Sequence, residues 1–412
     1  MSRTFLVSVL ARSAASGCRR PVGGRPRFPI RRWQRLAALA ALAGITLAGS
    51  RAPAAPPRPI WARTITADSA GSSVSPAGIC VDGQGDTIVA GTFRGSARCD
   101  AQTTVTAGST NNWLFLAKYN PAGGLIWVKT GGSTNNSSSA QAGAVCADAA
   151  GNIYLGANLV GENNIDGVDV SSDGSWIAVA KLDPNGNVLW LTNAMCSGNS
   201  VAAITRIAVD AQGRVVAMGG FTALLTFGNN WTIQSEQIPS FSGPFYPSAL
   251  LATLSREGAW TAVTYPSPGY LNRYIEFAAV AGTNVFYGGN SVLTYYFDTD
   301  QGIRTSETAD LCYFGNVNSW SREYGGGNVG SPTSPILDNG TLSGLAVDEQ
   351  GNVYTSGSYG PGAWTFSPTV TTNLPSGGTA FLAKFDPVGG TNLSVALLTN
   401  ALPLVAGDHN QG

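Results

Sequence analysis

The chain has 412 residues, of which only 12% are charged while 52 are glycine. Ten of the 24 basic residues and none of the 24 acidic residues come before residue 55, so the remainder carries a formal net charge of −10. An acidic chain whose few lysines are well separated has no basic stripe that could neutralise phosphates, so we expect no nucleic-acid partner. Abundant glycine with few charges is typical of turn-rich extracellular β proteins and not of cytosolic enzymes.

The N-terminal segment has the pattern of a secretory signal. Arg31, Arg32 and Arg35 precede an uncharged run of Leu, Ala, Ile, Thr and Gly at residues 36–49. That run is shorter than the roughly 20 residues that a membrane-spanning helix needs, and the small residues at 52–54 offer a cleavage site. We therefore predict that residues 1–54 are a cleaved leader. The mature protein is then expected at the cell surface, outside the cell or in the periplasm, without a membrane span.

A strand–turn–strand motif recurs along the rest of the chain. Residues 79–91 (ICVDGQGDTIVAG) align without a gap with residues 345–357 (LAVDEQGNVYTSG). Residues 145–157 and 207–219 follow the same template, and a degraded copy without the aspartate lies at residues 277–290. Self-similarity at a period of about 66 residues predicts a repeat architecture with five copies.

A second motif follows the first in each copy. It occupies residues 115–129, 177–191, 250–263, 311–324 and 381–397. Alternating apolar residues that lead into Asp-x-x-Gly or Asp-Pro-x-Gly predict a hairpin, because Asp or Pro opens the turn and Gly takes the positive φ. We interpret the turn aspartates as structural residues; they are Asp82, Asp148, Asp183, Asp210, Asp348 and Asp386.

Two hairpins per unit give four antiparallel strands, and no helical period occurs after the leader. This pattern predicts an all-β chain, a β-propeller of about five four-stranded blades over residues 55–404, followed by a tail at 405–412. An array of immunoglobulin-type domains would need about 100 residues per unit. Residues 60–64 match the last strand of a unit, so an incomplete six- or seven-bladed propeller stays open as the alternative.

The units resemble the secreted bacterial β-propeller repeats of the SBBP type, seven-bladed-propeller-like units in which AVDxxGNVYxxG alternates with FLAKYDxxGNxLW. The resemblance covers about residues 60–400 and is strongest in residues 145–190 and 345–386. It fails in the fourth unit, where the aspartate near Ala281 is missing, so we expect an irregular fourth blade. The resemblance implies the fold and export, and it supports a binding role without implying one shared chemistry.

Long connections are predicted on the face opposite the tight turns. They include residues 95–112, 161–174, 222–247 and 359–378, with a local hairpin at 225–233. Binding residues usually lie on such loops of a rigid scaffold. Aromatic side chains among Asn, Ser and Thr suit a glycan or a protein partner, and the candidates are Trp231, Tyr246, Tyr265 and Tyr270. The alternative is that these polar residues only solvate the loops.

The chain offers few residues for catalysis. Its one histidine, His409, lies in the tail, which argues against a Ser-His-Asp triad, a Cys-His pair or a histidine metal site. Residues 298–300 (Asp-Thr-Asp) resemble a calcium loop, but Gly302 comes too early and the twelfth position lacks a glutamate. Residues 181–190 resemble a quinoprotein blade ending without its threonine. We therefore assign no catalytic residue, no metal and no cofactor.

Five cysteines follow the leader, an odd number without a CxxC pair. Cys80 and Cys146 occupy the repeat position that Ala208 and Ala346 fill in other copies. This equivalence predicts small buried strand residues rather than metal ligands or a disulfide framework.

The sequence therefore predicts an exported, monomeric propeller that acts as a binding or interaction module. Its ligand is unknown, and the expected partner is a glycan or another protein. Two alternatives stay open, namely a propeller enzyme of quinoprotein-like or carboxylate-based type and a structural surface component.

Overall fold

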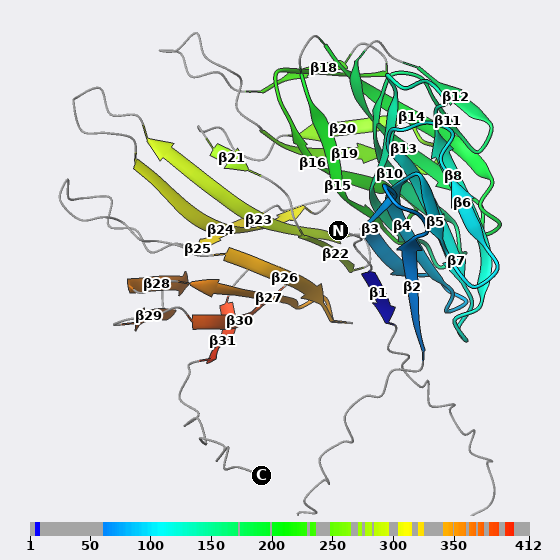
Figure 1. The fold of residues 1–412 in the computed structure, drawn as a ribbon. Coiled ribbons are helices and arrows are strands. Elements are labelled where there is room, and N and C mark those ends of the chain that lie inside the picture. Colours follow the sequence, from blue (N-terminus) through cyan, green and yellow to red (C-terminus); the bar gives the residue numbers. More distant parts are fainter. Residues whose placement is uncertain are drawn as a thin grey trace, which may run out of the picture. The chain divides into compact units, whose positions relative to one another are not determined.

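The computed structural model describes seventeen stretches of the chain. They are residues 5–8, 61–171, 174–197, 200–228, 231–235, 248–264, 271–273, 277–281, 284–295, 304–314, 320–324, 341–348, 350–359, 362–367, 370–374, 379–386 and 392–398. Every element assigned among them is a β-strand (Figure 1). In this part of the chain no helix has the length and hydrophobicity to span a bilayer. By internal contacts, Met1–Leu6 and Thr64–Gly412 form one unit and Val7–Arg63 another, and β1 (Phe5–Ser8) straddles their boundary.

Three successive sheets share one plan of four antiparallel strands, each paired with the next. The first sheet contains β3 (Ser73–Val81), β4 (Thr87–Arg94), β7 (Trp113–Tyr119) and β8 (Leu125–Gly132). The second contains β9 (Ser139–Ala147), β10 (Ile153–Val160), β13 (Ser175–Leu182) and β14 (Val188–Cys196). The third contains β15 (Ala202–Val209), β16 (Val215–Phe221), β19 (Ser248–Leu254) and β20 (Trp260–Thr264).

Two further sheets follow along the chain. The fourth contains β21 (Leu271–Arg273), β22 (Phe277–Ala281), β23 (Asn284–Tyr295), β24 (Arg304–Phe314) and β25 (Trp320–Tyr324). Its long β23 pairs with β24 on one side and with both β21 and β22 on the other, so this sheet is irregular. The fifth contains β26 (Thr341–Val347), β27 (Val353–Tyr359), β30 (Thr379–Phe385) and β31 (Asn392–Leu398).

The four regular sheets repeat even in their irregularities. A register shift falls at one equivalent point between the third and fourth strands, at Lys118/Tyr119, Lys181/Leu182, Thr253/Leu254 and Lys384/Phe385. Bulges are specific features of a sheet, so their recurrence marks the repeats as structurally equivalent. The chain is all-β, and its several antiparallel sheets resemble propeller blades, which confirms the predicted fold class.

A hairpin between the second and third strands of a sheet attaches to the fourth strand of the preceding sheet. β11 (Asn163–Ile165) and β12 (Val168–Val170) add to β8, and β17 (Leu224–Phe227) and β18 (Trp231–Gln234) add to β14. β5 (Ser96–Arg98) and β6 (Thr104–Thr106) add to β2 (Ala62–Ala67) in the same way. β28 (Gly362–Ser367) and β29 (Val370–Leu374) form the corresponding hairpin of the fifth sheet.

These hairpins change the expected loop face. The predicted hairpin at 225–233 is confirmed by β17 and β18. The connections at 95–112, 161–174 and 359–378 also contain paired strands, in line with the expectation that part of the long connections forms local hairpins. Cross-strand pairing satisfies backbone groups that an open loop would leave to water.

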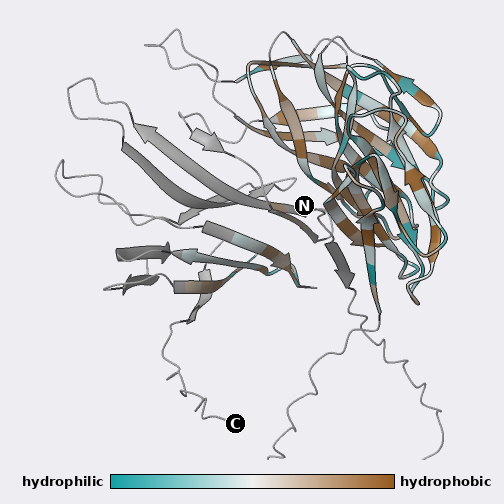
Figure 2. Cartoon of the chain, viewed as in Figure 1, coloured by the Kyte–Doolittle hydropathy of each residue, from teal (hydrophilic) through white to brown (hydrophobic). Residues whose placement is uncertain are grey.

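Central strands are buried on both faces because a neighbouring sheet covers each face. All seven residues of β16 are buried, and β4 and β10 are buried except near their ends. Figure 2 shows hydrophobic residues gathered in the strands of the first three sheets. In such strands apolar and polar residues do not alternate, as they do in a sheet that has one face exposed to water.

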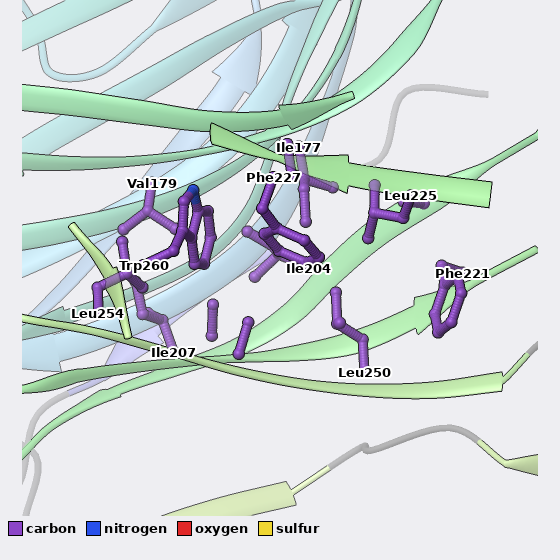
Figure 3. Packing of buried hydrophobic residues seen from close by; sticks show 14 of the residues in the cluster. Ile177, Val179, Ile204, Ile207, Phe221, Leu225, Phe227, Leu250, Leu254 and Trp260 are labelled. Atoms are coloured by element: carbon purple, nitrogen blue, oxygen red, sulfur yellow. The ribbon is translucent and has the colours of Figure 1, made fainter. Parts of the chain in front are cut away.

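Apolar clusters join successive sheets. Leu116 of the first sheet and Val145 of the second belong to one cluster. A second cluster joins the second and third sheets, with Ile177 of β13 and Ile204 of β15 among its members (Figure 3). A third places Leu251 of the third sheet against Ala278 of β22. Burial of such side chains stabilises the fold by about 1.5–3 kcal/mol each.

Candidate functional site

The tight turns of the sheets are built around an aspartate. Oδ1 of Asp148 accepts hydrogen bonds from the backbone N–H groups of Ala150 (3.0 Å) and Asn152 (2.9 Å). Gly151 has a φ of 84° and donates its N–H to the Asp148 carbonyl at 3.0 Å. Equivalent hydrogen bonds from the second and fourth following residues reach the carboxylates of Asp82, Asp183, Asp210 and Asp348.

Asp386 stands directly after β30, at the equivalent point of the fifth sheet. In a four-stranded antiparallel meander, the first and third turns lie at the same end of the sheet. We call the turns at 82–86, 120–124, 148–152, 183–187, 210–214 and 255–259 the turn rim.

The second carboxylate oxygen of the aspartate differs in its partners between the first three sheets, while Asp348 of the fifth sheet repeats the contacts of Asp148. Oδ2 of Asp148 accepts hydrogen bonds from Asn152 Nδ2 (2.8 Å) and the Tyr154 hydroxyl (3.1 Å). Oδ2 of Asp210 instead pairs with Arg214 Nε at 2.7 Å. The turn geometry is therefore constant, while the charge environment differs between sheets.

The first sheet has a buried ion cluster at this rim. The Lys118 ammonium lies 2.8 Å from Asp82 Oδ2 and 3.2 Å from Asp86 Oδ2, and the side chains of Lys118 and Asp82 are 5% and 0% exposed. Burial disfavours the Lys118 ammonium, but hydrogen bonds to the two carboxylates outweigh it and raise the pKa of Lys118. Lys118 therefore stays charged inside the rim.

The same lysine also ties two sheets together. Lys118 Nζ donates to the Pro184 carbonyl (3.3 Å) in a turn of the second sheet, and Trp127 Nε1 donates to that carbonyl at 3.2 Å. Trp190, the repeat equivalent of Trp127, donates to the Arg256 carbonyl of the third sheet at 3.1 Å. These hydrogen bonds therefore connect neighbouring sheets at the turn rim.

In the first sheet, the charged groups of the turn rim are occupied by contacts within the protein. The ammonium of Lys118 is already engaged by two carboxylates and a carbonyl, so no position is left there for a ligand. Among the described residues, no group of three or more His, Cys, Asp and Glu side chains is placed to hold a metal ion. The geometry of this rim serves stability.

The opposite ends of the strands carry the attached hairpins, and we call β5–β6, β11–β12 and β17–β18 the hairpin rim. Polar side chains pair across each hairpin, namely Ser96 with Thr106 (3.2 Å), Asn164 with Asp169 (2.7 Å) and Thr226 with Thr232 (3.3 Å). These side chains are exposed or half-buried. The hairpin rim thus presents hydroxyl, amide and carboxylate groups from rigid strands.

Trp231 is the aromatic side chain exposed on this rim within the described part of the chain. It begins β18, is 38% exposed, and its ring centroid lies 6.3 Å from that of Phe227. Phe227 is buried and contacts Trp260 edge-on at 4.8 Å, and Figure 3 shows these two rings side by side. Core packing beneath the hairpin therefore holds Trp231 at the surface.

The other predicted binding residues are not placed. Tyr246, Tyr265 and Tyr270 lie outside the described residues. Of the four aromatic candidates, the structure thus positions Trp231, and whether the tyrosines join it remains a prediction.

Of the four cysteines that the structure describes, Cys99 and Cys196 are buried, and Cys80 and Cys146, predicted to be buried, are half-buried on their strands. Burial, with a smaller contribution from Asp82, raises the pKa of Cys80 to about 12, and burial raises that of Cys196 to about 11. Cys80 packs in the cluster between the first and second sheets, whereas Cys146 packs in the next cluster. The two side chains serve different sheet contacts despite their equivalent positions.

Sequence reasoning missed the side chains that join the sheets. Lys118 had been counted only as a charge, although its recurrence in the FLAK pattern as Lys181 and Lys384 was a usable signal. Asn158 was also missed; its side chain accepts from the Ile204 N–H (2.7 Å) and donates to the Ile204 carbonyl (3.3 Å) of the next sheet. No sequence pattern identifies that contact, because it depends on how two sheets pack.

Comparisons with known proteins add a distant structural likeness. No protein-family model matches the chain, and the search of curated proteins returned no similar sequence. Among solved structures, the WD40 domain of SCAP from fission yeast is similar with a TM-score of 0.25 and 8% sequence identity, over 81% of this chain and 92% of that one. The blade assignment rests on the strand order and the recurring bulges.

Proposed function

We propose that this chain is an exported β-propeller of the secreted bacterial repeat kind that acts as a binding module at the cell surface or outside the cell. The observation that carries the proposal is the contrast between the two rims. The turn rim is filled by internal ion pairs and hydrogen bonds, whereas the hairpin rim presents polar pairs and an exposed indole on paired strands. Rigid presentation lowers the entropy cost of binding.

The ligand class that these side chains suit is a glycan. An indole face packs against the apolar face of a sugar ring. Thr226 and Thr232 point to the other face of the hairpin, where their hydroxyls can exchange hydrogen bonds with sugar hydroxyls. Phe227 and Trp260 support the indole from below, so little side-chain freedom is lost on binding. A protein partner is the alternative occupant of the same surface.

The test is a glycan array followed by thermal-shift titration of the mature chain, because a ligand that binds only the folded state raises its melting temperature. We expect saturable binding that Trp231→Ala abolishes and Trp231→Phe partly retains. The melting temperature of unliganded Trp231→Ala is the control for its folding. Binding that survives Trp231→Ala would contradict this site. A stabilising shift with a quinone and calcium would favour the enzyme instead.

A further inference from the structure

The Lys118 ammonium and the Asp82 carboxylate lie in direct contact in the interior of the first sheet. The two groups are 2.8 Å apart, and their side chains are 5% and 0% exposed. In the strand register, Lys118 lies between Ile88 of β4 and Trp127 of β8. Both of these side chains pack in the apolar cluster between the first and second sheets. The stem of the lysine is therefore flanked by apolar groups, and its charged end meets a carboxylate away from water.

The two oxygens of the Asp82 carboxylate have different surroundings. Oδ1 accepts hydrogen bonds from the backbone N–H groups of Gln84 (2.9 Å) and Asp86 (3.0 Å). Within the described residues, Oδ2 is buried and accepts no hydrogen bond besides its contact with the Lys118 ammonium. Two N–H donors at such distances are the arrangement that stabilises negative charge on the oxygen of a carbonyl group under nucleophilic attack. The Asp82 carboxylate is thus held for attack by the nitrogen that it contacts.

A second carboxylate lies beside the same nitrogen. Oδ2 of Asp86 is 3.2 Å from Lys118 Nζ. A carboxylate at this distance can accept a proton from the nitrogen and return it to a leaving oxygen. This carboxylate distinguishes the turn from three of the equivalent turns, which have an asparagine at the same position, namely Asn152, Asn187 and Asn352.

The equivalent lysines are not placed for the same contact. In the second sheet, Lys181 lies over the Tyr154 ring at 5.2 Å, and the Tyr154 hydroxyl itself donates to the turn aspartate. In the fifth sheet, Lys384 lies 4.0 Å from Asp348 Oδ2, and its side chain is 30% exposed. Among the sheets that the structure describes, the first therefore combines a buried lysine, a buried carboxylate in contact with it and a second carboxylate.

We propose that Lys118 and Asp82 form an intramolecular isopeptide bond, a covalent cross-link between β7 and the turn that joins β3 to β4. The reaction begins when the Lys118 ammonium transfers one proton to Asp82 Oδ2, which gives a neutral amine beside a neutral carboxylic acid. Burial lowers the cost of this transfer, because buried charges lose the solvation that water would give them. A desolvated lysine amine is a competent nucleophile.

The remaining steps balance in atoms and charge. Nζ of Lys118 attacks Cγ of Asp82, and the two backbone N–H groups stabilise the negative charge that develops on Oδ1. Asp86 takes a proton from the nitrogen and passes it to Oδ2, so the Cγ–Oδ2 bond breaks and one water molecule leaves. The products are an amide between Nζ and Cγ, one water molecule and the Asp86 carboxylate. The reaction is a condensation and needs no oxidant or reductant.

The bond has a direct consequence for the stability of the turn rim. It closes the chain between residues 82 and 118 and fixes the first turn of the sheet to the third strand. A covalent cross-link of this kind restricts the unfolded chain, as a disulfide does in the chain-entropy model. Unlike a disulfide, an amide is not broken by reducing agents.

The test is mass spectrometry of the purified full chain after denaturation and after proteolytic digestion. We expect the wild-type protein to weigh one water molecule less than its sequence predicts. The digest should contain one linked pair of peptides, one with Asp82 and the other with Lys118. Lys118→Met should abolish both signals, whereas Lys181→Met, which changes the equivalent lysine of the second sheet, should keep them.

Asp86→Asn tests the mechanism without removing either linked residue. The turn should still fold, because three equivalent turns have asparagine at this position. The bond should stay unformed, since general acid–base catalysis contributes about 10²–10⁴-fold in rate. Far-UV circular dichroism checks that each variant is folded.

Three results would contradict parts or all of this proposal. Unlinked Asp82 and Lys118 peptides of full mass from the folded wild type would overturn it. Loss of water without a linked pair would also overturn it and would indicate a cyclic imide between Asp82 and Gly83. A linked pair that forms equally in Asp86→Asn would support the bond but overturn the role of Asp86.

Discussion

At the scale of single residues, the turn aspartates share one geometry while their surroundings differ. Lys118 and Lys181 occupy the same repeat position, yet Lys118 is buried between two carboxylates, whereas Lys181 lies over the Tyr154 ring at 5.2 Å. The difference follows from strand β4, which has Ile88 where β10 has Tyr154. A tyrosine fills the space beside Asp148 in the second sheet, and the lysine fills it in the first.

Lys118→Met should destabilise the protein strongly. The change leaves the buried Asp82 carboxylate without its cation, and removal of one partner of a buried pair costs about 3–5 kcal/mol. Lys181→Met is the matched control, since it removes a cation–π contact of about 0.5–1 kcal/mol. Urea denaturation of both variants measures the difference. Equal losses of unfolding free energy in the two variants would mean that the buried ion cluster stabilises the fold no more than the cation–π contact does.

Asp183 should contribute a pH-dependent part of the stability. Burial opposes its ionisation, but hydrogen bonds from the N–H and side-chain amide of Asn187, the Asn185 N–H and the charge of Lys129 outweigh it and lower the pKa. A lowered folded-state pKa gives stability that is present above the unfolded value, about 3.9, and is lost as the pH falls below it.

The variant Asp183→Asn keeps a side-chain oxygen that can accept hydrogen bonds, but its amide does not ionise. We therefore expect the melting temperature of the wild type to exceed that of Asp183→Asn at pH 6, with the gap narrowing towards pH 3. A gap that widens in acid would reverse the sign of this contribution.

At the scale of elements, each hairpin is held to the preceding sheet by both backbone and side-chain contacts. β17 pairs with β14, and the buried Leu225 and Phe227 pack in the cluster between the second and third sheets. Lys129 of the first sheet pairs with Asp166 in the β11–β12 turn at 2.8 Å. The hairpins therefore connect adjacent sheets through backbone pairing and side-chain contacts.

Phe227→Ala should weaken the attachment of the β17–β18 hairpin to the second sheet and lower the stability of the fold. The ring is 1% exposed, so its truncation should cost about 3–5 kcal/mol of folding free energy. Trp231→Ala removes a larger side chain from the same hairpin, but one that is 38% exposed, and should cost less than half as much. Denaturant midpoints of the two variants test this order. The reverse order would show that Trp231 is a core residue and weaken its assignment to a binding surface.

At the scale of the whole chain, each of the first three sheets contacts the next one through an apolar cluster. The cluster that contains Leu116 and the cluster that contains Ile204 are separate, and Asn158 and Trp190 add polar links between the second and third sheets. Stability in such a chain is approximately a sum of repeat and nearest-neighbour terms.

The sequence by itself determined the strand content, the repeat and the Asp-x-x-Gly turns, because each copy of the repeat carries a pattern of residues close to one another in the chain. Asp148, for example, accepts hydrogen bonds from Ala150, Asn152 and Tyr154. The irregular fourth sheet was also predictable, since its repeat lacks the turn aspartate.

Only the tertiary structure decided which side chains join the blades. Pro184 lies 66 residues beyond Lys118, and Ile204 lies 46 residues beyond Asn158, so no local pattern shows that they meet. The same is true of the β11–β12 hairpin, whose short strands lie beside β8 of the preceding sheet, whereas the hairpin at 225–233 was predicted from the sequence. Trp231 and Phe227 are cross-strand partners on one face of the hairpin, yet Trp231 is exposed and Phe227 is buried, and this difference likewise depends on the packing around the hairpin.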